Sequence, residues 1–312
     1  MRSTKPNLNR IIRRARDDDS TPLGELTKRS TTHWGYPPGF FDWAPGASDV
    51  LPGYIAENPV YVLDDDGRVV GYYGFTKEGD DLLLDKLFVD RDRIGTGCGK
   101  RLWLHAVDTA RDLGYLELVI GSDPNAASFY EAMGAVWYAE KPTPSPEWTV
   151  QMFRFAIPPI AFRRAMLENA PELHALTGRS TLYWGYEPEF LDWEPQSIAV
   201  TPELIAGSVT YLLEEGDRIA GYYTLVDQSS GLSLDKLFVE PDLIGTGRGK
   251  RLWLHAVATA QEMGATVLTF AADPNAAPFY RAMGAEWLRE EETTRAGWNL
   301  QMFRYLLTDD PA

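Results

Sequence analysis

The chain has 312 residues, 44% of them apolar, and its formal net charge at pH 7 is −15. This excess of carboxylates argues against a nucleic-acid partner, and it favours either a cationic substrate or simply a soluble surface. No apolar run reaches the roughly eighteen residues of a membrane span, so we expect no membrane partner. A single cysteine, Cys98, excludes an internal disulfide and suits a cytoplasmic protein.

An internal repeat organises the chain. Residues 30–155 and 180–305 align without a gap at an offset of 150, and about half of the aligned positions are identical. A repeat of this length indicates duplication of a whole domain. Pro158 and Pro159 mark a short linker between the copies. We therefore expect two domains, residues 1–157 and 158–312, each with its own core.

Hydrophobic periodicity and turn residues predict the elements of the first half in chain order. They are a strand at 8–15, a helix at 21–29, an aromatic segment at 31–43, strands at 60–63, 69–75 and 82–89, a helix at 97–113, a strand at 116–120, a helix ending at 134, and strands near 136–140 and 148–155. The strand at 116–120 must run parallel to the one at 82–89, because a helix connects them. The second half repeats each element, so the expected fold class is α/β, with a mixed sheet of the α+β kind in both domains.

A Gly-rich turn lies between the strand at 82–89 and the following helix. It reads Ile94-Gly95-Thr96-Gly97-Cys98-Gly99, and it returns at 244–249 with Arg248 in place of Cys98. Glycines let a ligand approach the backbone, and a helix start offers free N–H groups. We interpret both copies as anion sites, most plausibly for a pyrophosphate.

Two other glycine motifs do not fit this turn. A P-loop needs Ser or Thr after Gly-Lys, but Arg101 follows Gly99-Lys100. A dinucleotide-binding fingerprint needs a different glycine spacing. A tight turn without any ligand is the remaining alternative.

A second motif occurs at residues 123–135, Asp-Pro-Asn-Ala-Ala-Ser-Phe-Tyr-Glu-Ala-Met-Gly-Ala. Together with the Gly-rich turn and the order of elements, it resembles the GNAT family of acyl-CoA N-acetyltransferases over nearly the whole chain. The resemblance implies acetyl-CoA as cofactor, although Ile94 and Ile244 stand where the family usually has Gln or Arg. The cofactor-binding residues expected are Phe88, Val89, Ile94, Gly95, Thr96, Gly97, Gly99, Lys100, Asn125, Phe238, Val239, Ile244, Gly245, Thr246, Gly247, Gly249, Lys250 and Asn275.

The family's chemistry implies an acid for the leaving thiolate and a base for the attacking amine. Tyr130 and Tyr280 match the family's Tyr near the thioester sulfur; the alternative is a packed core aromatic. The candidate bases, Asp85 and Asp235, lie two residues beyond the position of the family's Glu, on the same strand face if no bulge intervenes. The alternative for these carboxylates is an ion pair, for example with Lys86.

The aromatic segment lies where the family builds its acceptor pocket. The acceptor-binding candidates are Trp34, Tyr36, Asp42, Trp184, Tyr186 and Asp192, because an ammonium or a ring fits such a set. A hydrophobic lid is the alternative interpretation. His105 and His255 read as structural, and no cluster has the spacing of metal ligands.

The leading hypothesis is an N-acetyltransferase that moves acetyl directly from acetyl-CoA to a primary amine of a small molecule, in a ternary complex. Two alternatives stay open: one half is a non-catalytic acyl-CoA-binding module, or the acceptor is a protein or peptide amine. As a protein partner we expect a second copy of the chain, in a homodimer.

Overall fold

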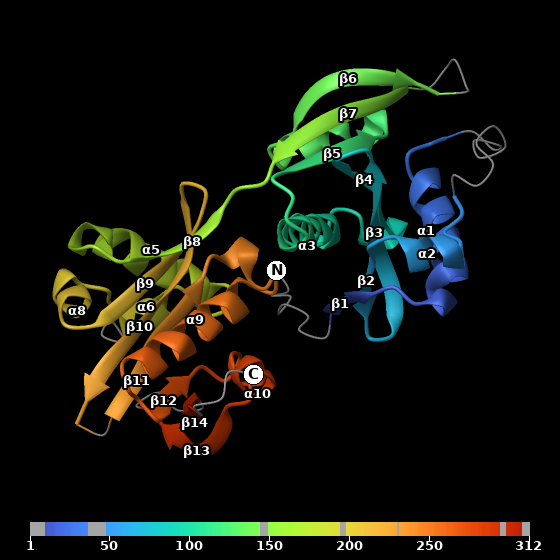
Figure 1. Ribbon diagram of the computed structural model, residues 1–312. Coiled ribbons are helices and arrows are strands. Elements are labelled where there is room, and N and C mark those ends of the chain that lie inside the picture. The colour runs from blue at the N-terminus through green and yellow to red at the C-terminus, as the bar shows by residue number, and fades with distance from the viewer. Residues whose placement is uncertain are drawn as a thin grey trace. The chain divides into compact units, whose positions relative to one another are not determined.

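The computed structural model describes residues 10–36, 48–143, 149–193, 198–229, 231–293 and 298–307. These residues form two compact units that meet in sequence at Pro158 and Pro159. Each unit is built around its own seven-stranded sheet, the first from blue to green and the second from yellow to red in Figure 1. The mixed sheets and their flanking helices confirm the predicted fold class.

The first sheet has the strand order β1-β2-β3-β4-β5-β7-β6. Its strands are β1 (Arg10–Arg14), β2 (Val60–Asp65), β3 (Arg68–Glu78), β4 (Asp81–Val89), β5 (Glu117–Ser122), β6 (Val136–Pro142) and β7 (Thr149–Ala156). The pair β4 and β5 is parallel, as the connecting helix predicts, whereas the other neighbouring strands are antiparallel.

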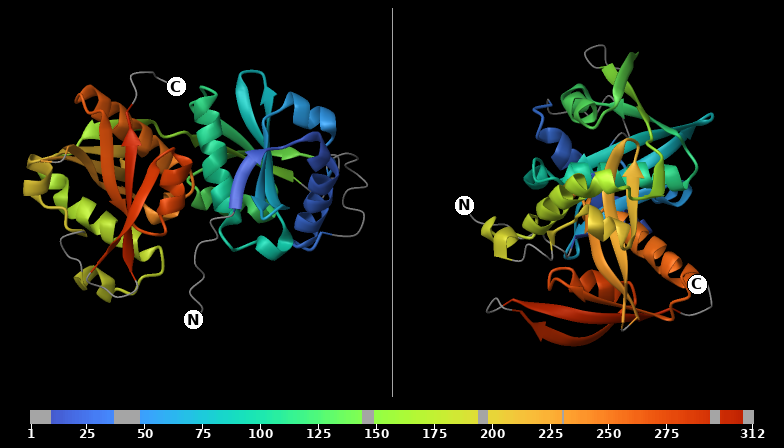
Figure 2. Two further views of the ribbon diagram at one scale, coloured as in Figure 1. Left: turned by 90° about the horizontal axis from the view of Figure 1, so that it is seen from below. Right: turned by 90° about the vertical axis from the view of Figure 1, so that its left-hand side faces the viewer.

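Helices cover both faces of the first sheet, as the left view of Figure 2 shows. They are α1 (Ser20–Thr32), α2 (Pro52–Glu57), α3 (Cys98–Asp112) and α4 (Ala127–Ala132). One apolar cluster joins α3 and α4 to the sheet, and a separate one joins α1 and α2 to its other face. Close approach of α3 depends on Gly71 in β3, because a Cβ there would lie 2.8 Å from Leu102 Cδ1 and 3.0 Å from the Phe88 carbonyl oxygen.

The second unit repeats this architecture in the order β13-β14-β12-β11-β10-β9-β8. Its strands are β8 (Ile160–Arg164), β9 (Val209–Glu215), β10 (Arg218–Gln228), β11 (Gly231–Val239), β12 (Val267–Ala272), β13 (Glu286–Glu292) and β14 (Asn299–Leu306). Its helices are α5 (Ala170–Leu182), α6 (Glu189–Trp193), α8 (Pro202–Ala206), α9 (Arg248–Glu262) and α10 (Ala277–Ala282).

Two irregularities of β4 shape the centre of the first sheet. Its parallel ladder with β5 is limited to Leu83 with Val119 and Leu84 with Ile120. Directly after this ladder, Phe75 of β3 pairs with Leu84 while Gly74 pairs with Lys86, so Asp85 between them is a bulge. In the second unit Asp235 is the bulged residue in the same way, and one pair, Ser233 with Thr269, forms the parallel ladder. Beyond the bulge, β4 and β11 therefore continue toward their Gly-rich turns outside the ladder with the neighbouring parallel strand.

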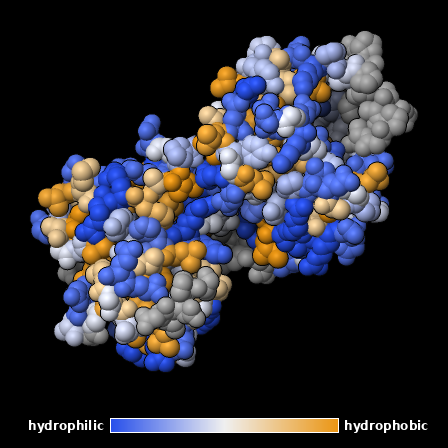
Figure 3. Space-filling model, viewed as in Figure 1, coloured by the Kyte–Doolittle hydropathy of each residue, from blue (hydrophilic) through white to orange (hydrophobic). Residues whose placement is uncertain are grey.

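Hydrophilic and apolar residues alternate over the surface visible in Figure 3. On the face drawn in Figure 3, orange apolar residues are scattered in small groups among blue hydrophilic ones. None of the helices in the described ranges combines the length and the apolar character that crossing a membrane requires.

Candidate active site

The Gly-rich turn of the first unit is open at two positions. Gly95 and Gly97 have φ values of 78° and 86°, in the left-handed region that side chains rarely adopt. A Cβ built on either glycine would meet no atom of the protein within 4 Å. Gly97 is the N-cap of α3, and no side chain caps the helix there. The first N–H groups of α3 are therefore available for an anion.

The second unit repeats this geometry. Gly245 and Gly247 have φ values of 78° and 97°, and Gly247 is the uncapped N-cap of α9. A Cβ added to Gly247 would again have no protein atom within 4 Å. Both turns thus keep the backbone conformation and the free surface that a bound phosphate needs.

The third glycine of each turn, Gly99 or Gly249, differs from the first two in its backbone conformation and its neighbours. A Cβ on Gly99 would lie 3.5 Å from the Phe129 ring, and one on Gly249 would lie 3.6 Å from the Phe279 ring. Neither has a positive φ. These two glycines therefore also lie against the next helix, and their part in cofactor binding, through the backbone N–H groups of the first helical turn, stays a prediction. Lys100 is partly buried and Lys250 is exposed at the same helix starts.

The last residues of β4 and β11, just before the Gly-rich turns, pack into the cores of the two units. Val89 and Val239 are 8% and 7% exposed. Phe88 stacks on Tyr72 at 5.7 Å between ring centroids, and Phe238 stacks on Tyr222 at 5.9 Å. The partly buried side chains of Ile94 and Ile244 lead from these strands into the turns. The backbone around both phenylalanines is thus fixed beside the point where the parallel ladder has ended.

The bulge places Asp85 beside Lys86 and Tyr54. The Tyr54 hydroxyl donates to Asp85 Oδ2 at 3.1 Å, and Lys86 Nζ lies 3.5 Å from the same oxygen. Lys86 also lies over the Tyr54 ring, 5.2 Å from its centroid. The Asp85 side chain is 33% exposed, so solvent and a substrate can reach it. The sequence prediction placed Asp85 on the same strand face as the position of the family's Glu, provided that no bulge intervened. The bulge is at Asp85 itself, so this condition is not met. The alternative interpretation, an ion pair with Lys86, is present.

The second unit surrounds its carboxylate differently. Asp235 Oδ2 lies 3.3 Å from Lys236 Nζ, but Leu204 stands where the first unit has Tyr54. Gly74 makes room for Tyr54, because a Cβ on Gly74 would lie 2.5 Å from the Tyr54 hydroxyl. Its counterpart Thr224 carries a side chain instead. The Thr224 hydroxyl begins a buried chain of hydrogen bonds to Thr210 and then to Ser208, each 3.0 Å long.

The two candidate acids are buried aromatic residues. Tyr130 and Tyr280 are 5% and 7% exposed. Tyr130 packs edge-on against Trp103 at 5.8 Å and against Phe129 at 5.2 Å between ring centroids. Burial raises the pKa of both phenols well above the ordinary value, so each keeps its proton at neutral pH.

The aromatic segment and the motif after β5 meet at one point. The Tyr36 hydroxyl donates to Asp123 Oδ2, and it accepts from Asn125 Nδ2 at 2.8 Å. Asp123 also accepts from the backbone N–H of Asn125 at 2.7 Å, the capping bond that the sequence predicts. Burial raises the pKa of Asp123 above its usual range.

The second unit builds the same junction with one more donor. The Tyr186 hydroxyl donates to Asp273 Oδ2 at 2.6 Å and accepts from Asn275 Nδ2 at 3.0 Å. Trp298 Nε1 donates to the same hydroxyl at 3.1 Å. Sequence reasoning missed Asp123 and Asp273 as members of the site, because it treated them as helix caps alone. The side chains of Asn125 and Asn275, predicted to contact pantetheine, are engaged with the tyrosines in this structure.

Trp34, Trp184 and Asp192, the other acceptor candidates within the described residues, have surroundings different from this junction. Trp34 is 43% exposed and packs edge-on against His33. Trp184 packs against Tyr183 in the same manner. Asp192 is exposed on α6. Asp42 lies outside the described residues.

Two partly buried histidines form polar contacts on α3 and α9. His105 Nδ1 lies 2.7 Å from the Tyr73 hydroxyl, which also bonds Thr109 at 2.8 Å. His255 and Tyr223 repeat the contact at 2.8 Å. Burial lowers the pKa of His105 to about 4. Within the described part of the chain, no group of three His, Cys, Asp or Glu side chains could hold a metal ion.

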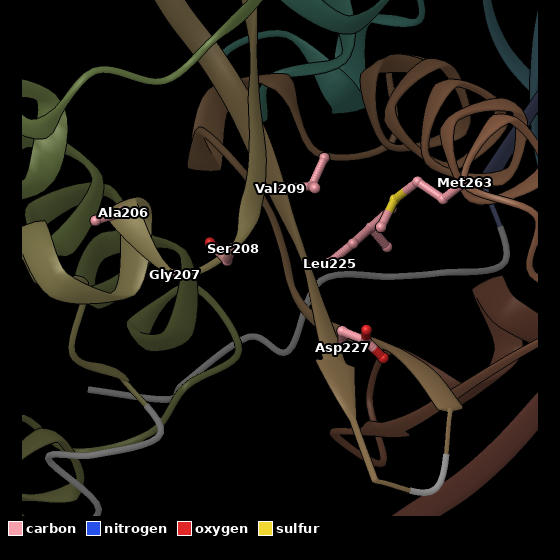
Figure 4. A pocket seen from close by; sticks show the side chains of 7 residues that line it. All are labelled: Ala206, Gly207, Ser208, Val209, Leu225, Asp227 and Met263. Carbon is pink, nitrogen blue, oxygen red and sulfur yellow. The ribbon is translucent and has the colours of Figure 1, made fainter.

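A small open hollow lies elsewhere in the second unit, with a volume of about 250 Å³. Figure 4 shows Val209, Leu225 and Met263 beside β10, with Asp227 farther along that strand. The hollow lies toward the β10–β11 hairpin, whereas the Gly-rich turn follows the other end of β11. None of the predicted site residues lines it.

Comparison with protein families gives two matches. The family described as acetyltransferase (GNAT) family matches residues 26–135, and the one described as acetyltransferase (GNAT) domain matches residues 196–307. Together the matched segments cover well over half of the chain. Among curated protein sequences, none matches this chain.

Solved structures similar to this chain each correspond to about half of it. A GCN5-related N-acetyltransferase from Rhodopseudomonas palustris is 21% identical, with a TM-score of 0.39, over 49% of this chain and 99% of its own. The PaiA N-acetyltransferase from Thermoplasma acidophilum, in complex with coenzyme A, is 18% identical, with a TM-score of 0.39, over 47% and 99%. The protein yncA from Salmonella typhimurium, with its cofactor acetyl-CoA, is 14% identical, with a TM-score of 0.36, over 49% and 97%.

Proposed function

Because both halves of the chain belong to the GNAT family of acetyltransferases, we propose that the protein transfers acetyl from acetyl-CoA to a primary amine of a small molecule. Transfer is direct, in a ternary complex, and each half has its own site. The observation that supports this proposal best is the presence in both halves of an open Gly-rich turn at an uncapped helix start. A single buried cysteine agrees with the reducing cytoplasm as the location.

The residues present fit coenzyme A at both turns. Backbone N–H groups at the starts of α3 and α9 hold the pyrophosphate, and the open surface over Gly97 and Gly247 lets it approach. From there the end of β4 or β11 leads back to the bulge, along strand backbone outside the parallel ladder. The backbone of this strand end would hold the pantetheine arm, and Asp85 or Asp235 would then be available to the amine that attacks the thioester. Bound acetyl-CoA supplies an activated acyl group.

The chain's residues manage the protons and the charge of the transfer. Asp85 or Asp235 accepts the proton that the amine must lose before its lone pair forms the new C–N bond. Backbone N–H groups around Phe88 and Phe238 donate to the carbonyl oxygen while it carries negative charge. When the C–S bond breaks, the phenol of Tyr130 or Tyr280 gives its proton to the departing sulfur. The raised pKa keeps that proton on the phenol until this step.

The acceptor pockets of the two halves differ although the cofactor turns agree. Tyr54 lies against the first carboxylate, whereas Leu204 and a chain of three hydroxyls accompany the second. The net charge of −15 favours a cationic acceptor for both. We infer one cosubstrate and two acceptor preferences.

A second candidate function rests on the same difference. If the surroundings of Asp235 do not support catalysis, the second half is an acyl-CoA-binding module that supports the first. The acceptor is then determined by the first half alone. A protein or peptide amine is the alternative acceptor, and the experiment below distinguishes it from a small-molecule amine.

The test combines binding with turnover. Calorimetry with acetyl-CoA should give two binding sites per chain, and a panel of small amines should release free thiol in its presence. One site per chain would favour the module, and no binding at all would overturn the proposal. Turnover with peptide amines alone would replace the small-molecule acceptor.

A further inference from the structure

Beneath each Gly-rich turn a carboxylate pairs with a guanidinium, and one member of each pair is buried while the other is partly buried. The carboxylates are Asp65 at the end of β2 and Glu215 at the end of β9, and they occupy equivalent positions, 150 residues apart. The guanidinium comes from a different position in each half: Arg248 in the second half, and Arg10 in the first. Their counterparts are Cys98 and Ile160, neither of which is charged.

In the second half the arginine belongs to the turn itself. The Arg248 side chain is fully buried, and its Nη2 lies 2.6 Å from Glu215 Oε1. Its Nη1 donates to the carbonyl oxygen of Thr246 at 3.2 Å. Because a trans peptide directs its C=O and N–H to opposite sides, this bond turns the N–H of Gly247 away from the guanidinium. Arg248 thus ties the turn to β9 and orients one of its amides outward.

In the first half the cation reaches the same place from strand β1. Arg10 is the cross-strand neighbour of Asp65, and its Nε lies 3.2 Å from Asp65 Oδ2. Its Nη1 contacts the sulfur of Cys98 at 3.7 Å, which places the guanidinium against the residue that replaces Arg248. Arg93, just before the turn, also pairs with Asp65 at 3.2 Å. Two different chain positions thus supply a guanidinium at one location.

Stability alone gives a weak reason for this arrangement. Removing two charges from water costs more than a well-packed apolar pair would. The guanidinium does, however, neutralise a carboxylate beneath the turn that would otherwise repel an anion above it. It also fixes the turn before the ligand arrives, which lowers the entropy lost on binding.

We propose that Arg248 with Glu215, and Arg10 with Asp65, are positioning residues that hold each Gly-rich turn ready for the pyrophosphate of coenzyme A. This inference rests on the proposed function. It assigns to Arg10, at the start of the described chain, a part in a site whose turn lies more than eighty residues away.

The test exchanges the two arrangements. Arg248→Cys gives the second half the residue of the first half without its cation. We expect coenzyme A affinity at the second site to fall by about 10- to 100-fold, the scale of a lost charge-assisted hydrogen bond, with the first site unchanged. Adding Ile160→Arg to this variant supplies a cation from the position that corresponds to Arg10, and it should restore the affinity to within about threefold. Calorimetry with coenzyme A measures both sites.

Pantetheine, which lacks the diphosphate, is the second probe. Its affinity should be the same in the wild-type chain and in the variant, because the pair acts only on the phosphate end. An equal loss for pantetheine and coenzyme A, or no rescue by Ile160→Arg, would overturn the positioning role. A wild-type chain that binds no coenzyme A would instead refute the proposed function. If Arg248→Cys does not fold, Arg10→Ile combined with Arg93→Leu, and the rescue of this variant by Cys98→Arg, put the same question to the first half.

Discussion

The hydroxyl of Tyr186 donates to Asp273 Oδ2 at 2.6 Å, across 87 residues of sequence. Tyr36 and Asp123 make the same contact in the first half. The tyrosine comes from the segment after the first helix of each unit, and the aspartate follows the strand that runs parallel to β4 or β11. The contact therefore joins the expected acceptor segment to the motif expected to meet the cofactor. We therefore expect binding at one of these segments to depend on the position of the other.

Tyr186→Phe should loosen this junction. The change removes one donor from Asp273 and one acceptor from both Asn275 and Trp298, all partly buried. We expect a loss of about 1–3 kcal/mol in the unfolding free energy of the second unit, the cost of leaving buried polar groups unsatisfied. Denaturant titration measures this loss, and Tyr36→Phe tests the first unit. Unchanged stability in both variants would contradict the structural role of the junction.

The open glycines should be needed for binding rather than for packing. Gly97→Ala adds a Cβ where no protein atom lies within 4 Å, and it strains a residue with φ of 86°. Gly79 is the matched control, with φ of 63° and equally empty surroundings in the β3–β4 turn. Both variants should lose roughly 1–2 kcal/mol of stability from backbone strain. Only Gly97→Ala should also weaken coenzyme A binding in calorimetry, on the order of tenfold, because its methyl group occupies the phosphate approach. Equal affinities in the two variants would refute the anion site.

Local chemistry made much of the fold predictable. A connecting helix imposes the parallel order of β4 and β5, and residues with positive φ at a turn are nearly always glycine, as at Gly95 and Gly97. Likewise, Asp66 and Gly67 predict the β2–β3 hairpin, and both have positive φ.

Contacts between distant segments were not predictable in this way. The bulge at Asp85 depends on the register of β3 against β4, and register leaves no mark in the composition of one strand. The partnership of Tyr36 with Asp123, and that of Arg10 with the turn, needs the folded sheet to bring the segments together. The contact of Gly99 with the Phe129 ring was not predictable either, because sequence spacing cannot distinguish a glycine beside a ring from one open to solvent.

The carboxylate at the bulge should set the turnover of its own half. Asp85→Asn should lower kcat in the first half by roughly 10²–10⁴, the usual contribution of a base, and leave coenzyme A affinity unchanged. Asp81→Asn, an exposed carboxylate on the same strand, is the control and should have no effect. Initial rates with an amine accepted by the first half provide the measurement. Full activity in Asp85→Asn would show that water, and not Asp85, accepts the proton of the amine.

The acceptor preference of the first half should follow Tyr54 and Gly74. Tyr54→Leu combined with Gly74→Thr installs the residues of the second half around Asp85. We expect the kcat/KM ranking of the amine panel in the first half to move toward that of the second half, while KM for acetyl-CoA stays the same. An unchanged ranking would exclude these two positions as determinants of specificity.

The partly buried His105 should make stability depend on pH. The pKa of His105 is lowered to about 4 by burial, from an ordinary value of 6.5. Between these values the unfolded chain binds more protons than the folded one, so its stability is full above about pH 6.5 and falls as the pH drops toward 4. His105→Gln should make the fall shallower, as measured by unfolding midpoints between pH 7 and pH 4.5. The exposed His33→Gln should leave the fall as steep as in the wild-type chain. If stability fell as steeply with falling pH in the His105 variant as in the wild-type chain, His105 would not be the cause of this pH dependence.

The leaving group provides the most direct test of which half is catalytic. Tyr130→Phe and Tyr280→Phe remove one hydroxyl each and keep the rings that pack against Trp103 and Trp253. If the phenol protonates the departing sulfur, turnover in the altered half should fall by roughly 10²–10⁴, with acetyl-CoA affinity unchanged within a few-fold. Each single variant should lose the activity of its own half, and the double variant nearly all activity in the thiol-release assay. Loss with Tyr280→Phe but not with Tyr130→Phe would make the first half the silent module. Wild-type turnover in the double variant, measured where chemistry limits the rate, would show that the thiolate leaves without help from either tyrosine.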